Sequence, residues 1–303
     1  MPVKRPPCLK PFVHKKNLIL TVMHGYDYPF VEPFIKSLRS SGCAADLVIF
    51  ISDKVSKTTK RMLKKKGAVL ITYNSQYPFI ESCKGDFENM VSTVTINNYR
   101  FIFYLRYLVE NGKDYQNVML TDIRDVIFQR NPFGEDLKDN ICFFLEDPVQ
   151  TFSYSELNYK WLTDATDACT ASKYVNDTVS CAGVTIGSVN RVIDYLNYIK
   201  GKLDFRAELP WGLDQGIHNS YVYNIKPVGM VLYKNEQPFV YNMGAYQPYK
   251  LNSKNEVVNK EDQSYQIIHQ YDRFGELLEL MKSKYTGSRL VQKLKRAYFA
   301  LMP

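Results

Sequence analysis

Residues 17–23, NLILTVM, form an apolar and β-branched run between Lys16 and the turn-like HGYDYP, and this pattern predicts a buried strand. A segment with apolar residues at helical spacing follows and ends at Gly42. Two more apolar runs, 46–52 and 68–73, lie on either side of a basic segment with helical spacing. Alternating strands and helices are typical of a parallel sheet with crossover helices, so the sequence predicts an α/β fold.

Two aspartates follow the next predicted strand. Residues 97–112, NNYRFIFYLRYLVENG, are apolar around most of a helix and lead into NVMLTDIRDVIF at 117–128. Asp122 and Asp125 lie at the end of the strand in that stretch, and parallel sheets present functional groups at the carboxyl ends of their strands. Paired carboxylates there suit a divalent ion bound together with phosphates. Structural roles stay open, namely Asp122 as a cap and Arg124 with Asp125 as a local ion pair.

The composition is that of a folded protein rich in aromatic residues. Of the 303 residues, 45% are hydrophobic and 23% are charged, and 23 Tyr and 17 Phe raise the aromatic content, which favours an enzyme or a binding domain. The formal charge of +8 favours an anionic partner without choosing among phosphate esters, anionic lipid and nucleic acid. No RNP-like or helix-turn-helix signature accompanies the basic runs, so we expect no nucleic-acid partner.

The spacing of the cysteines and the lengths of the apolar runs indicate where in the cell we expect the protein. Six scattered cysteines form no CxxC pair, which argues against a structural zinc site and for reduced thiols. The first apolar run is too short for a signal-peptide core or a membrane span, and no later stretch reaches span length. We therefore expect a cytoplasmic protein.

The periodicity of the apolar residues changes in the second half of the sequence. Residues 151–178 are polar, aromatic and weakly periodic, and we expect an irregular excursion over the active face. A strand is predicted at 181–188, a helix directly after it, and a loop-to-helix segment at 212–222. Because no linker signal is present, the sequence favours one catalytic domain over residues 1–275 and a C-terminal basic helical appendage over 276–303.

The end of the appendage, SRLVQKLKRAYFALMP at 288–303, combines apolar and basic residues at helical spacing. A basic amphipathic helix can lie on an anionic membrane, which would suit a lipid-linked acceptor, or it can pack on its own domain. Peripheral membrane contact through this helix is therefore an open alternative to a purely cytoplasmic location.

The stretch TDIRDVIFQRNPF, residues 121–133, closely resembles a signature of nucleotide-sugar glycosyltransferases of the GT-A fold. In those families an Asp-x-Asp pair, often followed by NPF, holds the metal ion that bridges the donor diphosphate. Counting back from NPF places Asp125 at the second carboxylate and Ile123 at the first, whereas this chain has Asp122 and reads Asp-x-x-Asp. Residues i and i+3 do not share one face of a strand, so both carboxylates can bind one ion only if the chain bends there.

Three later stretches extend the resemblance over residues 17–275. CAGVTIGSVNRVIDYL, which contains Gly183, is similar to a segment that lines the donor sugar and the acceptor. GLDQGIHN, which contains Asp214 and Gln215, is similar to the Asp-Gln segment of glycogenin-like enzymes, and IIHQYDR supplies His269 where related families complete the metal or diphosphate site. Each has a structural alternative: the histidine as an ordinary buried residue, the glycine as a turn, and Asp214 as a helix cap.

The resemblance implies a Rossmann-like GT-A fold, with a mostly parallel central sheet flanked by helices. It also implies a metal-dependent transferase that moves a sugar from a UDP- or GDP-sugar to a glycan, lipid-linked or protein acceptor, with a lean toward retention of configuration. In this chain Mn²⁺ or Mg²⁺ would be held by Asp125, with Asp122 and His269 as further ligands.

The resemblance also assigns roles along the donor. The residues expected to contact the nucleotide or its diphosphate lie on the first strand and its end, on the helix before the metal strand, and on the 181–188 strand: Thr21, His24, Tyr26, Arg100 (or Arg106 in its place) and Gly183. Asp214 and Gln215 would act on the transferring sugar as the anomeric bond breaks.

Two other functions stay open. A sugar nucleotidyltransferase uses a related sheet and a carboxylate-bound metal, but HGYDYPF after the first strand has one glycine and no lysine, and this disfavours the glycine-rich basic loop of that class. A non-catalytic nucleotide- or carbohydrate-binding protein would bind without transfer. A Rossmann dehydrogenase is not expected, because no GxGxxG follows the first strand.

Overall fold

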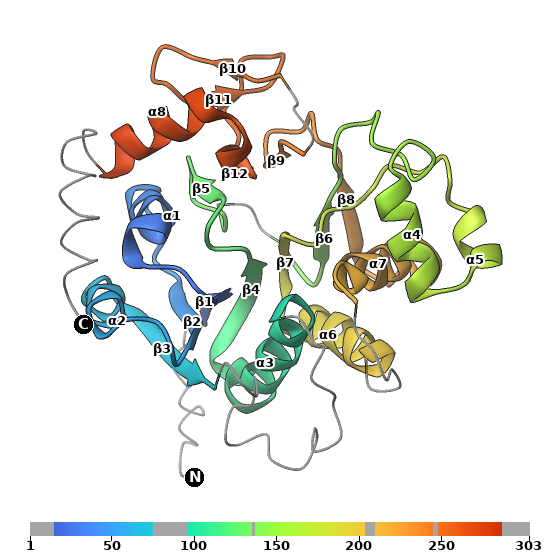
Figure 1. The fold of residues 1–303 in the computed structure, drawn as a ribbon, viewed down its shortest axis with the longest axis horizontal. Helices are drawn as coiled ribbons and strands as arrows, with labels where there is room; N and C mark the ends of the chain where they lie inside the picture. The colour runs from blue at the N-terminus through green and yellow to red at the C-terminus, as the bar shows by residue number, and fades with distance from the viewer. Residues whose placement is uncertain (1–14, 75–95, 135–136, 204–209, 245–247, 287–303) are drawn as a thin grey trace, which may run out of the picture.

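The computed structural model describes residues 15–74, 96–134, 137–203, 210–244 and 248–286. Its centre is a seven-stranded sheet with helices on both faces (Figure 1). In sheet order the strands are β3 (Ala68–Tyr73), β2 (Asp46–Ser52), β1 (Lys16–Met23), β4 (Tyr115–Thr121), β7 (Val184–Ser188), β6 (Ile141–Phe144) and β8 (Met230–Tyr233).

Six of the seven strands of this sheet run in one direction. β1 pairs in parallel with β2 and β4, and β2 pairs in parallel with β3. β7 is antiparallel to both of its neighbours, β4 and β6, and β6 pairs in parallel with β8. The protein is thus an α/β protein with a mostly parallel, mixed sheet, which confirms the predicted fold class at that level and is compatible with a Rossmann-like fold.

The helices lie close to the positions that the apolar spacing predicts, with the exception of the two between residues 151 and 178. In chain order they are α1 (Tyr28–Ser40), α2 (Lys57–Lys65), α3 (Ile96–Asn111), α4 (Glu156–Ala165), α5 (Ala168–Ser172), α6 (Val189–Leu203), α7 (Leu213–Ser220) and α8 (Gly275–Thr286).

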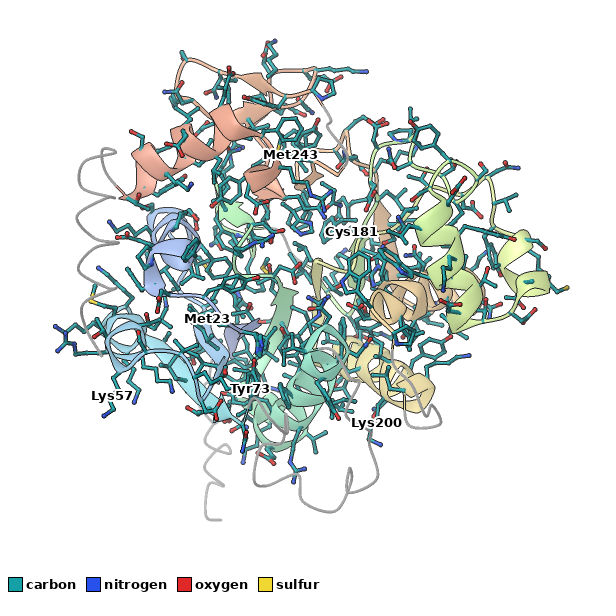
Figure 2. All side chains as sticks on the ribbon, viewed as in Figure 1. Met23, Lys57, Tyr73, Cys181, Lys200 and Met243 are labelled. Atoms are coloured by element: carbon teal, nitrogen blue, oxygen red, sulfur yellow. The ribbon has the colours of Figure 1, made fainter. Side chains whose placement is uncertain are left out.

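The two faces of β1 pack against different helices. Leu18 and Leu20 belong to a core cluster with residues of α3 and α6, whereas Ile19 packs in a second cluster with residues of α1. Successive side chains of a strand point to opposite faces, so one continuous apolar run supplies both cores. In Figure 2, Met23 of β1 lies inside the protein and Lys57 of α2 lies at its periphery.

A smaller three-stranded sheet lies beside the end of β4. Its central strand is β12 (Ile267–His269), which is antiparallel to β5 (Val126–Phe128) and parallel to β9 (Val240–Asn242). A short hairpin of β10 (Lys250–Leu251) and β11 (Val257–Val258) follows β9 in the chain. The small sheet brings residues from distant parts of the sequence to the end of the central sheet.

The sequence predicts an irregular segment at 151–178. This prediction is wrong, because the segment contains α4 and α5. α4 buries Leu162 and Ala165 and packs against α7. Short helices in proteins are stabilised mainly by tertiary packing, so a segment with weak periodicity can be helical when a partner helix lies against it. The segment does cover the candidate site, because residues of α4 line the cavity described below.

The expected boundary between the domain and its appendage falls at the start of α8. Leu277 and Met281 of α8 are buried in a cluster with residues of the three-stranded sheet, and the helix also packs against α1. The basic stretch 288–303 lies outside the described residues. Among the helices of the described ranges, none combines the length and the apolar character needed to cross a bilayer.

Candidate metal centre and the cavity around it

A bend after β4 brings the two aspartates together. β4 ends at Thr121, and residues 122–125 form a turn before β5 begins. The Asp122 N–H donates to the Gly183 carbonyl at 2.9 Å, and the Gln270 N–H donates to the Asp125 carbonyl at 2.7 Å. The chain therefore bends at the place where the i, i+3 spacing requires a bend for both carboxylates to face one point.

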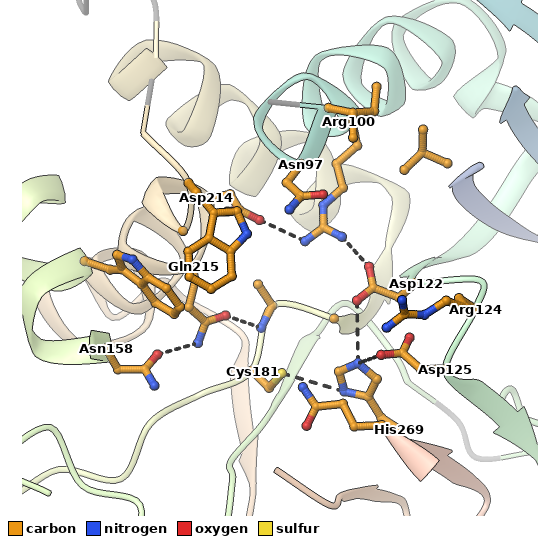
Figure 3. A pocket seen from close by; sticks show the side chains of 18 of the residues that line it. Asn97, Arg100, Asp122, Arg124, Asp125, Asn158, Cys181, Asp214, Gln215 and His269 are labelled. Atoms are coloured by element: carbon orange, nitrogen blue, oxygen red, sulfur yellow. Dashed lines mark hydrogen bonds and ion pairs between the residues drawn. The ribbon is translucent and has the colours of Figure 1, made fainter. Parts of the chain in front are cut away.

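His269 completes a triad with the two aspartates. Its Nε2 lies 3.5 Å from Asp122 Oδ2 and 4.0 Å from Asp125 Oδ2, and the side chain is 1% exposed (Figure 3). One potential ligand atom from each of the three residues lies within 4.8 Å of the others. Two carboxylate oxygens and an imidazole nitrogen at these separations can bind a divalent cation.

The partners of Asn242 fix a proton on one nitrogen of His269 and leave the other nitrogen, Nε2, as the one that can bind a metal ion. The Asn242 amide nitrogen donates to the Phe144 and Leu145 carbonyls at 3.2 and 3.0 Å, so its Oδ1 faces His269 Nδ1 at 2.9 Å. Because an amide oxygen only accepts, this network assigns the proton to Nδ1. Nε2 is buried and makes no hydrogen bond with any residue of the described ranges. A second partner that fixes the tautomer in this way is the usual arrangement behind a metal-binding histidine, so the residues fit a metal.

The three side chains of the triad and Arg100 shift one another's pKa values. Burial raises the pKa of Asp125, and the nearby Asp122 carboxylate adds to the rise against the opposing effect of His269. Burial would also raise the pKa of Asp122, but the Arg100 guanidinium and His269 outweigh it and lower the pKa to about 2. Burial would lower the pKa of His269, yet Cys181 and the two aspartates hold it well above its usual value. A cation at this point would replace the proton on Nε2.

Gly183 makes room for this arrangement. A Cβ atom at this position would lie 2.2 Å from His269 Cε1, 2.5 Å from His269 Nε2 and 3.0 Å from Asp122 Oδ2. No side chain fits there unless the imidazole moves. The close approach of backbone to the triad, and not a simple turn, is therefore what requires glycine at this position.

Arg100 links the triad to the other half of the cavity. It extends from α3, pairs with Asp122, and pairs through a second nitrogen with Asp214 Oδ2 at 3.0 Å. Asp214 lies in the first turn of α7, but Gly212 is the capping position of that helix and has no capping side chain. Burial raises the pKa of Asp214, and Arg100 opposes the rise. Asp214 thus acts as an ion-pair partner rather than as a cap.

Gln215 faces the cavity wall, and its amide is occupied. Its Oε1 accepts the Ala182 N–H at 2.9 Å, and its Nε2 donates to the Ser180 carbonyl at 2.7 Å. These bonds hold the chain that leads into β7 and hence Gly183. The amide thus clamps that segment, and its contact with the transferring sugar stays a prediction.

The residues expected to contact the nucleotide differ in their placement. His24 and Tyr26 line the cavity; His24 is bonded to the Tyr73 hydroxyl at 2.9 Å, and Arg124 lies over the Tyr26 ring at 5.7 Å. Thr21 is fully buried in β1 and is not among the lining residues, because it precedes the end of the strand.

The ion-pair partners of Arg124 and Arg106 decide between the alternatives that the sequence leaves open for these two residues. Arg124 pairs with Asp272 at 3.2 Å and not with the neighbouring Asp125. Arg106 pairs with Glu110 on α3 and does not line the cavity, which leaves Arg100 as the arginine of that helix that enters it.

The cavity has a volume of about 540 Å³ and two chemically different ends. The triad lies at one end with Tyr26 and Arg124, and the other end is formed by α4 and the start of α7. Lining residues that sequence reasoning did not identify come largely from α4, the turn before α7 and the ends of β6 and β12: Asn97, Arg124, Glu146, Asn158, Trp161, Cys181, Trp211 and Arg273. One available signal was the rarity of tryptophan, since both tryptophans of the chain line this cavity.

The chain matches no protein-family model, and no curated protein shows significant similarity to it. The chemistry of the cavity and the sequence motifs are therefore the basis for a functional conclusion.

Proposed function

We propose that the protein is a metal-dependent glycosyltransferase of the GT-A type, which transfers a sugar from a nucleotide-diphosphate sugar to an acceptor hydroxyl. The observation that carries the proposal is the triad of Asp122, Asp125 and His269 in one cavity with Arg100 and Asp214. The likeness of TDIRDVIFQRNPF to the transferase signature supports the same function.

The ligand set favours Mn²⁺ over Mg²⁺. Mg²⁺ prefers oxygen ligands and keeps most of its waters, whereas Mn²⁺ accepts an imidazole nitrogen beside carboxylates more readily. When bound, the ion would supply Lewis-acid stabilisation of the charge on the departing diphosphate. His269 Nε2, Asp122 and Asp125 would hold it, with Asn242 fixing the imidazole.

The remaining side chains act on the donor itself. Arg124 and Arg273 add positive charge to the triad end of the cavity, where a diphosphate is expected. The rings of Tyr26 and His24 offer surfaces against which a nucleotide base can lie. Because Arg100 holds Asp214 as its ion-pair partner, a carboxylate is kept beside the sugar and can stabilise positive charge that develops on the anomeric carbon.

The test is donor turnover by the full chain with a panel of UDP-, GDP- and CMP-sugars in Mn²⁺ or Mg²⁺, measured as nucleotide release. We expect metal-dependent release that falls at least about 100-fold in Asp125→Asn, as expected for the loss of a metal ligand. Asp139→Asn is the matched control, because Asp139 is an exposed carboxylate that pairs with Arg191 away from the cavity. Metal-dependent release that survives Asp125→Asn would contradict the assigned metal site.

The same panel, extended by nucleoside triphosphates with sugar phosphates, separates the two alternatives. A non-catalytic binding protein would bind a nucleotide or a sugar in calorimetry and release nothing over hours. A sugar nucleotidyltransferase would release pyrophosphate from a nucleoside triphosphate and a sugar phosphate. Release of a free nucleoside diphosphate, faster with an acceptor than without one, is the outcome that only the transferase predicts.

A further inference from the structure

The two tryptophans of the chain meet at the end of the cavity opposite to the triad. Trp161 lies on α4 and Trp211 lies in the turn before α7, with ring centroids 4.8 Å apart and ring planes at 84°. Trp211 is 58% exposed, although tryptophan is a residue that folding usually covers to a large extent. An exposed indole that lines a cavity offers a flat apolar surface to a ligand.

The corner formed by these rings is built into the packing of α4 on α7. Gly212 has φ +82°, and a Cβ atom there would lie 2.1 Å from Trp161 Cε2. A Cβ atom at Gly216 would lie 1.9 Å from the Trp161 carbonyl oxygen. The two glycines let α4 lie directly on the backbone of α7, so the position of the Trp161 ring is determined by both helices.

A polar side chain lies beside the aromatic corner. Asn158, one turn before Trp161, donates one amide hydrogen to Ser155 Oγ at 2.9 Å, and its Oδ1 accepts from Gln215 Nε2 at 3.4 Å. Within the described part of the chain, its second amide hydrogen has no partner. The corner therefore combines two indole rings with an amide that can bond a ligand hydroxyl.

We propose that this corner, Trp161, Trp211 and Asn158, binds a pyranose ring of a carbohydrate acceptor. A pyranose has one face of C–H groups, whose partial positive charge suits the negative face of an indole ring, and hydroxyls at its rim that suit an amide. This inference rests on the proposed function. It narrows the acceptor class from glycan, lipid or protein to a glycan. Trp211 lies three residues before Asp214, so a sugar on the corner would present its hydroxyl beside the transferring unit.

The rival occupant of the corner is the nucleotide base, which can also stack on an indole. The placement of the charged groups argues against it, because Arg124 and the triad lie at the other end of the cavity together with Tyr26 and His24. If the diphosphate binds at that end, the base lies near the rings of Tyr26 and His24. The tryptophan corner is then free for the other substrate.

Tryptophan fluorescence of the full chain tests the inference directly, because both indoles of the protein lie in this corner. The ligands are methyl glycosides of glucose, galactose, mannose and N-acetylglucosamine with their β-linked disaccharides, and separately UDP and GDP with Mn²⁺. We expect at least one saccharide to change the emission with saturation. Trp211→Ala should weaken its binding, measured by calorimetry, at least about tenfold, which is at the low end for a stacked ring.

Tyr154→Ala is the control for loss of an exposed aromatic, since Tyr154 is 66% exposed and does not line the cavity. We expect saccharide affinity unchanged in this variant. Trp161→Phe keeps a ring in place for the packing of α4 and should still lower saccharide affinity, which covers the case in which a larger truncation unfolds the protein.

The outcomes separate the subsite from the transferase proposal. Donor turnover without any saccharide response, or a response to UDP or GDP that Trp211→Ala abolishes, would overturn the acceptor corner and leave the transferase proposal in place. Saccharide binding that depends on Trp211, in a protein that turns over no donor, would overturn the transferase proposal and leave a carbohydrate site.

Discussion

Two histidines of this protein are equally buried and have opposite surroundings. His218 is 0% exposed, and both of its nitrogens are hydrogen-bonded, to Ser180 Oγ at 2.9 Å and to the Tyr195 hydroxyl at 2.7 Å. His269 is 1% exposed, and its Nε2 faces two carboxylates without a hydrogen bond. Burial and the charge of Arg100 lower the pKa of His218 to about 3, while the pKa of His269 is raised.

The difference shows how a structural histidine can be told from a candidate metal ligand. Burial is the same, so it does not separate them. What separates them is whether each nitrogen has a neutral partner that completes its hydrogen bonds, or whether one nitrogen is left facing negative charge. His218 packs against the buried rings of Phe143 and Tyr195 and does not line the cavity, whereas His269 lines it.

The largest expected effect is on metal affinity. His269→Ala removes a ligand and is expected to weaken Mn²⁺ binding by at least about 100-fold, measured by calorimetry. His218→Ala is expected to leave Mn²⁺ affinity within about threefold, but to lower the free energy of unfolding in urea by about 2–4 kcal/mol, because a cavity forms and two buried hydroxyls lose a partner. If His218→Ala abolished binding in a folded protein, the distinction between the two sites would fail.

Gly183→Ala tests whether the position of the His269 ring matters as much as its presence. The added Cβ would lie 2.2 Å from the imidazole, so the ring must move and Mn²⁺ affinity is expected to fall on the order of 100-fold, as after loss of orientation at a metal ligand. Gly201→Ala is the matched control, because Gly201 lies on helix α6 and, within the described residues, no heavy atom outside its own helix backbone lies within 4 Å of an added Cβ. That variant should bind Mn²⁺ like the wild type and be more stable by about 0.5–1 kcal/mol.

Asn242→Ala removes the residue that fixes the His269 tautomer. Removal of such a partner typically costs about 10- to 100-fold in metal affinity, and we expect a fall in that range by Mn²⁺ titration. Asn242→Asp keeps an oxygen that accepts from Nδ1 and should retain more affinity than the alanine variant. Equal affinity in the wild type and in Asn242→Ala would show that the imidazole is oriented by other means.

The smallest effect is a difference in the pH dependence of stability, measured by urea unfolding in EDTA. His218 binds its proton only below about pH 3 when folded and below about pH 6.5 when unfolded, so its contribution lowers stability as the pH falls from 6.5 to about 3. The raised pKa of His269 has the opposite sign, because its stabilisation is present below pH 6.5 and is lost as the pH rises toward the folded value.

Glutamine variants isolate the two contributions. His218→Gln should flatten the loss of stability between pH 6.5 and 3, and His269→Gln should flatten the loss above pH 6.5. An unchanged slope in either variant would show that the histidine concerned does not titrate as its surroundings imply.

Much of the architecture is predictable from local pattern. The apolar runs of β1, β2, β3 and β4 and the helices between them were predicted because buried parallel strands are continuous in apolar residues. The antiparallel direction of β7 was not anticipated, since direction depends on the connections and not on the residues of the strand. α4 was missed for a related reason: the glycines of α7 that receive it lie some fifty residues later in the chain.

The candidate site was predicted unevenly. The spacing of Asp122 and Asp125 implied a bend, and the bend is present. The two shortest hydrogen bonds of the Gln215 amide could not be read from the sequence, because their partners are backbone atoms of Ser180 and Ala182, which no side-chain pattern encodes. Thr21 was placed at the strand end by counting, and it lies too early in β1 to reach the cavity.

The position of β12 has a consequence for how the protein is made. The two carboxylates of the triad are synthesised before β7 and well before His269, which arrives with the strand that lies between β5 and β9. Chains fold progressively as they leave the ribosome, so a nascent chain that has produced only β4 and β5 carries an acidic corner without its imidazole. If the triad binds a cation as proposed, the complete ligand set forms only after translation has passed β12 and the small sheet has paired correctly.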